Sequence, residues 1–109
     1  MAIKECVERL KPLIIALEKT EDAINTTETR GNPIYAVNDI KMASRAIDLA
    51  TRIKDGIPEE ELSEIKKHLL EAREAAYAKK APSALGALGK LKDAILEKIL
   101  EKYHECASR

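Results

Sequence analysis

Apolar residues recur at intervals of three and four through most of this chain, and three short breaks interrupt the pattern. Those intervals place side chains on one face of an α-helix, because one helical turn takes 3.6 residues. The breaks are Gly31-Asn32-Pro33, Gly56-Ile57-Pro58 and Ala81-Pro82-Ser83. The pattern predicts four amphipathic helices, over about residues 2–29, 33–55, 58–80 and 83–107.

Glycine and proline at the breaks predict how the helices begin and end. Gly31 suits the left-handed conformation that often stops a helix, while Asn32 and Pro33 suit the N-cap and first turn of the next one. Gly56 is expected to stop the second helix as Gly31 stops the first. Ser83 is expected to cap the fourth helix, because its hydroxyl can accept a hydrogen bond from a free backbone N–H.

The apolar faces of the first two predicted helices differ in width. The first helix is expected to bury one stripe that contains an acid and that Cys6 and Leu13 widen: Ile3, Val7, Leu10, Ile14, Leu17, Glu21 and Ile24. Pro12 should kink this helix or mark a later start, because proline removes one backbone hydrogen bond. The second helix carries two stripes: Val37, Ile40, Ala43, Ile47 and Ala50, then Tyr35, Met42, Ala46, Leu49 and Ile53. It should therefore be the most buried of the four.

Long helices joined by short breaks favour an all-α, antiparallel up-down-up-down four-helix bundle. The 109 residues fit a single domain that covers the whole chain. A chain of this length buries roughly 65% of its unfolded surface, so it can fold without a metal or a disulfide. The core must be aliphatic, because the chain has no Phe, no Trp and only three Tyr. The third helix is expected to bury Leu62, Ile65, Leu69, Ala72 and Ala76, and the fourth Leu88, Leu91, Ile95, Ile99, Tyr103 and Cys106. Leu96 and Leu100 lie beside the stripe of the fourth helix, as bundle flank or as a dimer contact.

Charge narrows the classes of partner. Nineteen basic residues balance nineteen acidic ones, so the formal net charge is zero and no global field attracts nucleic acid or an anionic membrane. Charged residues make up 35% of the chain, above the usual share of about 25%. An excess of Glu and Lys is typical of hyperthermophile proteins and also of helix-rich proteins in general. A thermophilic source is predicted.

No targeting or membrane segment is expected. Lys4, Glu5, Glu8 and Arg9 stand among the first apolar residues, unlike the hydrophobic region of a signal peptide. The longest strictly apolar run, residues 13–17, is far shorter than the ~20 residues that a membrane-spanning helix needs. The sequence therefore predicts a cytoplasmic protein without a membrane partner.

One cysteine lies near each end of the chain, and the pair predicts an intramolecular disulfide between Cys6 and Cys106. In an up-down bundle the first helix begins where the fourth ends, so both cysteines fall in the same end layer on apolar stripes. The alternative is two buried thiols that act as small hydrophobic residues. Disulfides are unusual in the cytosol except in hyperthermophiles.

Four charged residues are expected at one level of the bundle, toward the end opposite the cysteines. Glu21 interrupts the first stripe, and Asp39, Arg73 and Lys92 lie within or beside the others. All four lie about 9–14 Å from the helix ends they share, at 1.5 Å per residue. They are boundary residues whose stems reach solvent, a buried network that fixes helix register, or the lining of a small-ligand site.

A basic cluster is expected at the end of the bundle where the third helix meets the fourth. Arg30, Lys79, Lys80 and Lys90 belong to it, and no acid lies between residues 75 and 92. With the free amides at the start of the fourth helix, these side chains could hold a phosphate or a nucleic-acid backbone. The alternative is solvated surface, since no aromatic residue lies at that end of the fourth helix to stack on bases.

No catalytic residue, metal site or cofactor is expected. Glu101 and His104 have the Glu-x-x-His spacing of ferritin-like di-metal proteins, but Ile65 takes the acid's place before His68, so the second motif is missing. The leading functional hypothesis is a small non-enzymatic helical module that binds a protein partner or itself through helix faces. The alternative is a nucleic-acid-associated accessory protein that uses the basic cluster.

Overall fold

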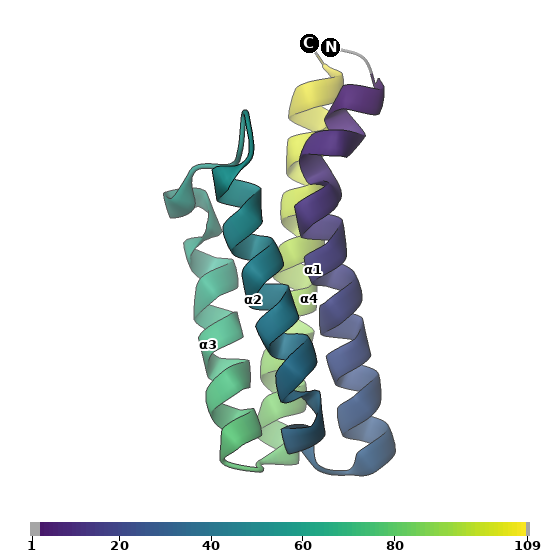
Figure 1. Ribbon diagram of the computed structural model, residues 1–109, viewed down its shortest axis with the longest axis vertical. Coiled ribbons are helices and arrows are strands. Elements are labelled where there is room, and N and C mark those ends of the chain that lie inside the picture. Colours follow the sequence, from purple (N-terminus) through teal and green to yellow (C-terminus); the bar gives the residue numbers. More distant parts are fainter. Residues whose placement is uncertain (1–2, 109) are drawn as a thin grey trace.

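The computed structural model describes residues 3–108, and four α-helices contain most of them. They are α1 (Ile3–Arg30), α2 (Val37–Arg52), α3 (Ser63–Tyr77) and α4 (Ala81–Ala107), with the short 3-10 helices η1 (Pro33–Ala36) and η2 (Glu59–Leu62) before α2 and α3. Successive helices run antiparallel, so α1 begins where α4 ends (Figure 1). The predicted all-α four-helix bundle is confirmed; the predicted start at Ala2 lies outside the described residues.

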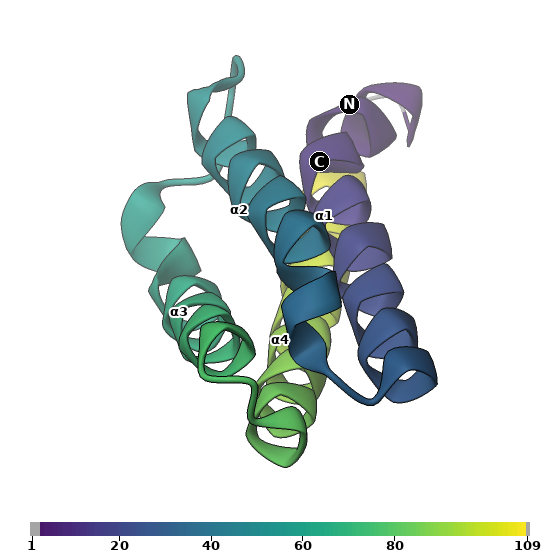
Figure 2. The ribbon, with the colours of Figure 1, turned by 60° about the horizontal axis from the view of Figure 1, so that its bottom comes forward.

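The four helices form two unequal pairs. α1 and α4 have 28 and 27 residues, whereas α2 and α3 have 16 and 15. At 1.5 Å per residue, the first pair is about 40 Å long and the second about 23 Å. α1 packs extensively on α2 and α4, and α3 on α4, but α2 and α3 contact each other little. Figure 2 shows α3 lying apart from α2 while α1 stays close to it, so one edge of the bundle is open.

The turn between α1 and α2 follows the sequence prediction. Gly31 has a φ of 72°, and its N–H donates to the carbonyl oxygen of Thr27 at 2.8 Å. The side-chain oxygen of Asn32 accepts from the N–H of Ile34 at 3.0 Å, which caps η1. Pro33 opens η1, where its missing N–H costs nothing because that group would have no partner.

Gly56 has a different role from the one predicted. α2 ends at Arg52, and Asp55 instead of Gly56 adopts the left-handed conformation, with a φ of 57°. A Cβ atom on Gly56 would lie 2.5 Å from the carbonyl oxygen of Thr51 and 2.7 Å from that of Ala50. Glycine is needed here because the returning chain passes directly over the end of α2.

The start of α4 also differs from the prediction. The helix begins at Ala81, and Ser83 lies in its first turn instead of capping it. Pro82 explains the shift, since a residue without an N–H fits the first turn of a helix, where amides have no helical partner. Lys79 ends α3 in the left-handed conformation with a φ of 58°, and the N–H of Lys80 donates to Ala75.

The buried face of α1 is rotated from the predicted stripe. Ile3 is 64% exposed and Glu21 lies on the surface, while the core takes this set: Cys6, Leu10, Pro12, Leu13, Ala16, Thr20, Ala23 and Thr27. The hydroxyls of Thr20 and Thr27 each donate to the carbonyl oxygen four residues earlier at 2.8 Å. This bond satisfies the buried hydroxyl and lets threonine serve as a small core residue. α1 is continuous through Pro12, so a later start is excluded.

α2 is less buried than predicted. Its first stripe lies in the core except for the partly buried Val37, but Tyr35, Met42 and Leu49 of the second stripe are exposed. Within residues 3–108, no helix is both long enough and apolar enough to cross a membrane.

Candidate functional site

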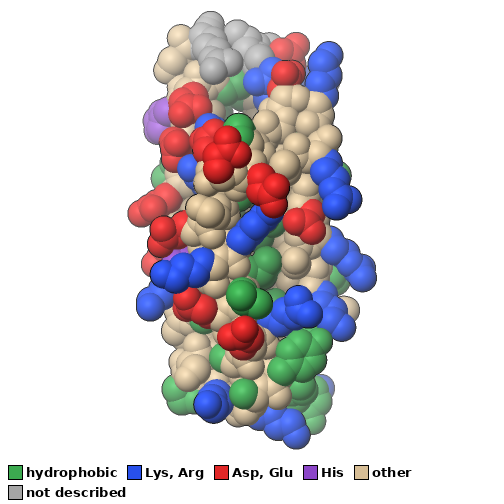
Figure 3. Space-filling model, turned by 90° about the vertical axis from the view of Figure 1, so that its left-hand side faces the viewer, with side chains coloured by type: hydrophobic (Ala, Val, Ile, Leu, Met, Phe, Trp, Pro, Cys, Tyr) green, Lys and Arg blue, Asp and Glu red, His purple; other side chains and the backbone are tan. Residues whose placement is uncertain are grey.

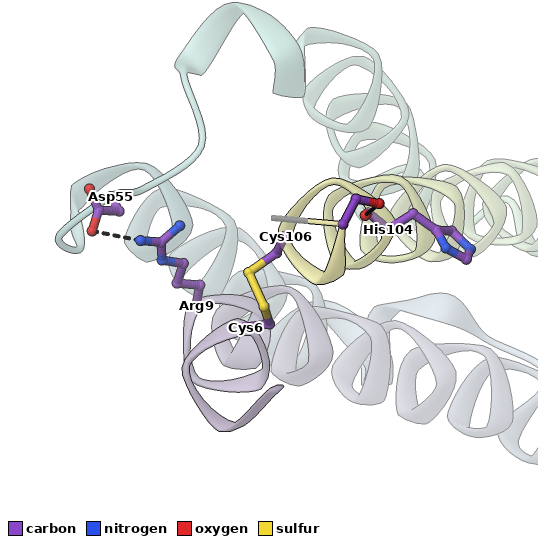
Figure 4. Close-up of a disulfide and its surroundings, with 6 residues drawn as sticks. Cys6, Arg9, Asp55, His104 and Cys106 are labelled. Atoms are coloured by element: carbon purple, nitrogen blue, oxygen red, sulfur yellow. Dashed lines mark hydrogen bonds and ion pairs between the residues drawn. A yellow bond between two sulfur atoms is a disulfide. The ribbon is translucent and has the colours of Figure 1, made fainter. Parts of the chain in front are cut away.

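Cys6 and Cys106 form a disulfide, which confirms the prediction. Their Cα atoms lie 5.8 Å apart, and both side chains are buried where α1 begins and α4 ends. Figure 4 shows the bond joining the two helices, with Arg9 reaching from α1 to Asp55 in the loop that follows α2. Arg9 Nη2 lies 2.9 Å from Asp55 Oδ2. The disulfide therefore ties the chain ends together, and the ion pair connects this end to the shorter helices.

The predicted buried network of four charges is wrong. Glu21 and Arg73 are exposed, and Asp39 and Lys92 are only half-buried. For Glu21 the reason is the orientation of α1. Thr20 is buried in the core at this level of the helix, so the neighbouring Glu21 lies on the surface. The alternative interpretation, boundary residues whose side chains reach solvent, matches the burial.

The surroundings of Asp39, one member of this predicted network, shift its pKa. Partial burial raises the pKa of its carboxyl above the ordinary 3.8, and the nearby charge of Asp22 raises it further. Lys19 opposes both effects. The like-charged neighbour and the opposing cation both come from α1, so this is a feature of the α1/α2 seam instead of a layer that joins all four helices.

The predicted anion-binding residues are divided between two places. Arg30 stacks on the ring of Tyr35, with its guanidinium carbon 4.7 Å from the ring centroid. Lys79 and Lys80 lie in the turn between α3 and α4, at the same end of the bundle as Arg30 (Figure 1). Lys90 instead lines a groove between α3 and α4 among acidic side chains. Anion binding by the other three residues stays a prediction.

A groove of about 380 Å³ runs along the open edge between α2 and α3. Its apolar lining consists of Ile40, Ile47 and Leu69, which are buried, and Leu70, which is 54% exposed. The remaining lining is polar: Lys41, Ser44, Arg45 and Asp48 from α2, and Lys66 and Arg73 from α3. Four cations against one carboxylate give this α2/α3 groove a formal charge of three positive units.

Like charges on both sides of the α2/α3 groove oppose its closure. Two of its cations belong to α2 and two to α3, so closing the edge would bring like charges together. Lys66 is partly compensated, since its Nζ donates to Glu59 Oε1 at 2.8 Å. That hydrogen bond, together with the charge of Lys66, holds the pKa of Glu59 below its ordinary 4.5.

A second groove, of about 340 Å³, lies on the other side of α3, against α4. It has five acidic residues and two lysines in its lining: Glu61, Glu64, Asp93, Glu97 and Glu101, with Lys90 and Lys98. With His68 neutral, this α3/α4 groove has a formal charge of three negative units. α3 thus separates two grooves of equal and opposite formal charge.

Ion pairs stabilise one end of the α3/α4 groove. Lys102 of α4 contacts Glu61 in η2 and also donates to Glu105 at 3.2 Å, while Lys98 donates to Glu101 at 3.1 Å. The hydrogen bond from Lys102 lowers the pKa of Glu61 below its ordinary 4.5, against a smaller opposing effect of burial. Burial would lower the pKa of Lys102, but its bonds to Glu61 and Glu105 raise it above 10.5.

His68 lies in the α3/α4 groove and is only 9% exposed. Its Nε2 is 3.3 Å from Glu64 Oε1, and its Nδ1 is 3.9 Å from Glu71 Oε2. In the part of the chain that the structure describes, no group of three or more His, Cys, Asp or Glu side chains is arranged to hold a metal ion.

Sequence reasoning missed the α2/α3 groove, although its signal is present. Lys41 and Arg45 are four residues apart, directly beside Ile40 and Ser44 of the buried side of α2. Two basic residues bordering a stripe at helical spacing indicate a charged seam. The missing information was the partner helix, because the sequence does not tell which seam stays open.

Comparison with known proteins adds no further assignment. Neither the protein-family models, nor the curated proteins, nor the solved structures contain a match to this chain. The arrangement of its own residues is therefore the basis for a functional proposal.

Proposed function

We propose that this protein is a non-enzymatic helical interaction module, which binds a protein surface through α3 and the grooves on either side of it. The α2/α3 groove carries the proposal, because it joins an apolar floor to a charged rim. An apolar centre surrounded by polar and charged groups is the usual anatomy of a protein interface. Exposed Leu70 and Tyr77, seven residues apart on α3, extend the apolar contact along the helix.

A protein surface fits the α2/α3 groove better than a small molecule does. The groove is open to solvent over residues 40–48 of α2 and 66–73 of α3, and these two helices contact each other little. A helix or a side-chain row laid along it would cover Ile47, Leu69 and Leu70 as a neighbouring helix covers the core elsewhere. Acidic groups on the partner would compensate the cationic rim, which favours one orientation over others.

The non-enzymatic part of the proposal rests on the state of the nucleophiles. Both cysteines are in the disulfide, so neither carries a thiol. His104 is exposed at the end of α4, and His68 contacts two glutamates instead of a hydroxyl or thiol. A nucleophile with a facing base, which covalent catalysis requires, has no candidate among these groups.

A nucleic-acid function is the less favoured reading. Lys90, one of its four predicted residues, lies among carboxylates in the α3/α4 groove, and Arg30 stacks on Tyr35. The cationic α2/α3 groove has an apolar floor, which a phosphate backbone would not use. A gel shift with duplex DNA or RNA at 50 and 200 mM salt tests this reading, since phosphate contacts weaken steeply over that range.

The decisive experiment for the interaction module is site-specific photo-crosslinking. A photoreactive amino acid at Leu70 should give a defined covalent adduct with another polypeptide. The same amino acid at Ile15, which is similarly exposed on α1, is the matched control and should not give that adduct. If Leu70 gives no adduct beyond the Ile15 control in the cells that produce the protein, the interaction module is wrong.

We also propose a cytoplasmic location in a thermophile, and the disulfide makes the two halves of this proposal depend on each other. Stable disulfides occur in oxidising compartments, or in the cytoplasm of hyperthermophiles. Intact mass of the protein from its own cells, alkylated before lysis, tests the combination together with cell fractionation. A disulfide-bonded protein in the cytoplasmic fraction of a mesophile would contradict it.

A further inference from the structure

We propose that the protein surface bound at α3 is a second copy of this chain, with the cationic α2/α3 groove of each copy against the acidic α3/α4 groove of the other. This inference rests on the proposed function, since it uses the same face. The predicted assembly is a closed dimer, and the charged residues of the two grooves determine how the two copies pair.

Charge complementarity is the first argument. The α2/α3 groove has a formal charge of three positive units and the α3/α4 groove three negative units. Figure 3 views the α3 side of the molecule, where Asp and Glu side chains gather at the upper left and Lys and Arg side chains follow the right-hand edge. Opposite potentials on facing surfaces steer association and fix its register.

The total charge is the second argument. The chain has nineteen bases and nineteen acids, so two copies do not repel each other as whole molecules. A formal net charge of zero promotes association, whereas a large net charge opposes it. The charge is balanced over the chain but divided across α3, and that distribution favours a copy of the same molecule as partner.

Exposed apolar residues on the same helix are the third argument. Leu70 is 54% exposed and Tyr77 is 49% exposed, and they lie on one face of α3 two turns apart. Figure 3 shows hydrophobic side chains in the lower half of this face, with the largest group at the lower right. Leu70 lines the cationic groove, and burial of Leu70 and Tyr77 against the second copy would supply the apolar contact that charged pairs alone do not provide.

A two-fold axis parallel to the bundle would satisfy both charge pairs at once. Rotation about an axis lying in the face places the right-hand, cationic edge of one copy opposite the left-hand, acidic region of the other. The acidic groove spans residues 61–68 of η2 and α3, and the cationic groove spans residues 66–73 of α3, so they are offset by five residues, or about 7.5 Å at 1.5 Å per residue. Long arginine and lysine side chains can bridge that stagger, and the interface closes on itself as a dimer.

Sedimentation velocity of the full chain tests the inference, with charge reversal on each side of α3. R45E/R73E makes the cationic groove acidic, and E64K/E97K makes the acidic groove basic. All four residues are exposed, so folding should be retained, and circular dichroism checks this. E18K/E28K on α1 is the control, because both residues are exposed and its net charge changes by the same amount as in E64K/E97K.

A concentration-dependent dimer is expected for the wild type and for the control. Each charge-reversed variant alone should dimerise at least about tenfold more weakly, because like charges then face each other. An equimolar mixture of the two variants should restore a dimer, since two grooves with a net negative charge then meet two grooves with a net positive charge. The wild-type Kd should rise at least about tenfold between 0.1 and 1 M NaCl, where the Debye length falls from about 10 to about 3 Å.

A wild type that stays monomeric at 0.5 mM and 0.1 M NaCl would overturn the inference. So would a dimer that persists unchanged in both charge-reversed variants, because its interface would lie elsewhere. The photo-crosslinker at Leu70 separates this failure from that of the proposed function. An adduct with a different protein, without one between two differently tagged copies, overturns the second copy and supports the interaction module; no adduct at all overturns both.

Discussion

The seams that the long helices α1 and α4 make with their neighbours differ from the seam between the two short helices, α2 and α3. Along the α1/α2 and α1/α4 seams, small buried residues such as Ala16 and Ala23 let the helices pack closely, and a disulfide closes one end. Along the α2/α3 edge, four cations line a groove that remains open. The same chain therefore has a closed half, the α1/α2 and α1/α4 seams, which provides stability. Its open half is the α2/α3 edge, where charged side chains keep contact with solvent.

The charges beside the buried face of a helix, and not the face itself, distinguish the open edge from the closely packed seams. α2 has a buried face as alanine-rich as that of α1, so it lacks nothing that close packing requires. The difference lies beside that face, where Lys41 and Arg45 of α2 lie across from Lys66 and Arg73 of α3. Like charges on both sides of a seam oppose its closure, and an apolar floor beneath them leaves a place for an acidic surface.

Removal of the disulfide should have the largest effect on stability. Replacing Cys6 and Cys106 with serine frees the two ends of a segment with a sequence separation of 100 residues. The free energy of unfolding should fall by up to about 4–5 kcal/mol, because the denatured chain regains the entropy that the link removes.

Urea denaturation of both proteins, with and without reductant, measures this loss. Reductant should destabilise the wild type by a similar amount and leave the double serine variant unchanged. Equal stability of the oxidised wild type and the variant would show that the closed half does not depend on the bond.

A pair of identical leucine truncations measures the difference between the halves directly. Leu13→Ala in α1 should lower the free energy of unfolding by about 2–5 kcal/mol, because the side chain is fully buried and leaves a cavity. Leu70→Ala in the α2/α3 groove should change it by less than about 0.5 kcal/mol, as expected for a surface position. Chemical denaturation at low protein concentration, where copies stay apart, gives both values; similar losses would mean that the groove is part of the core.

Much of this architecture could be predicted from spacing alone. The four helices, the Gly31-Asn32-Pro33 turn and the disulfide all follow from local periodicity and from the direction of successive helices. The error on α1 arose because large apolar residues were used to centre the stripe. Alanine and back-bonded threonine fill the closest seams, and a hydrophobicity pattern gives them little weight.

Tertiary contacts explain why the sites were harder to predict than the fold. The four-charge network failed because a rotation of α1 by part of a turn moves Glu21 from the core to the surface. The α2/α3 groove depends on which of the bundle's seams stays open, and no residue carries that information by itself. Gly56 was expected to matter through its φ, but it matters through carbonyl oxygens that the folded loop brings close.

Substitution of two glycines should produce effects of opposite sign. Gly56→Ala places a methyl group against backbone carbonyls at under 3 Å, so it should destabilise the α2–α3 connection by about 1–3 kcal/mol. Gly86→Ala adds a methyl group in open space within α4, and it should stabilise by about 0.5–1 kcal/mol through helix propensity. Thermal unfolding of both variants tests the pair, and a neutral Gly56→Ala would show that the loop relaxes freely.

The smallest effect should come from the ion pair between Glu61 and Lys102, which joins η2 to α4. The pKa of Glu61 is lowered from 4.5, so its contribution to stability is present above 4.5 and is lost as the pH falls through its folded value. The pKa of Lys102 is raised from 10.5, so its contribution to stability is lost only as the pH rises through its folded value.

Glu61→Gln should therefore lower the free energy of unfolding by less than about 1 kcal/mol at pH 7, because the pair is partly buried but still reaches solvent. The difference in unfolding free energy between the variant and the wild type should shrink as the pH falls below 4.5. Urea titrations from pH 7 to pH 3 would measure this difference. A difference that is unchanged at pH 3 would assign the effect to packing of the side chain instead of its charge.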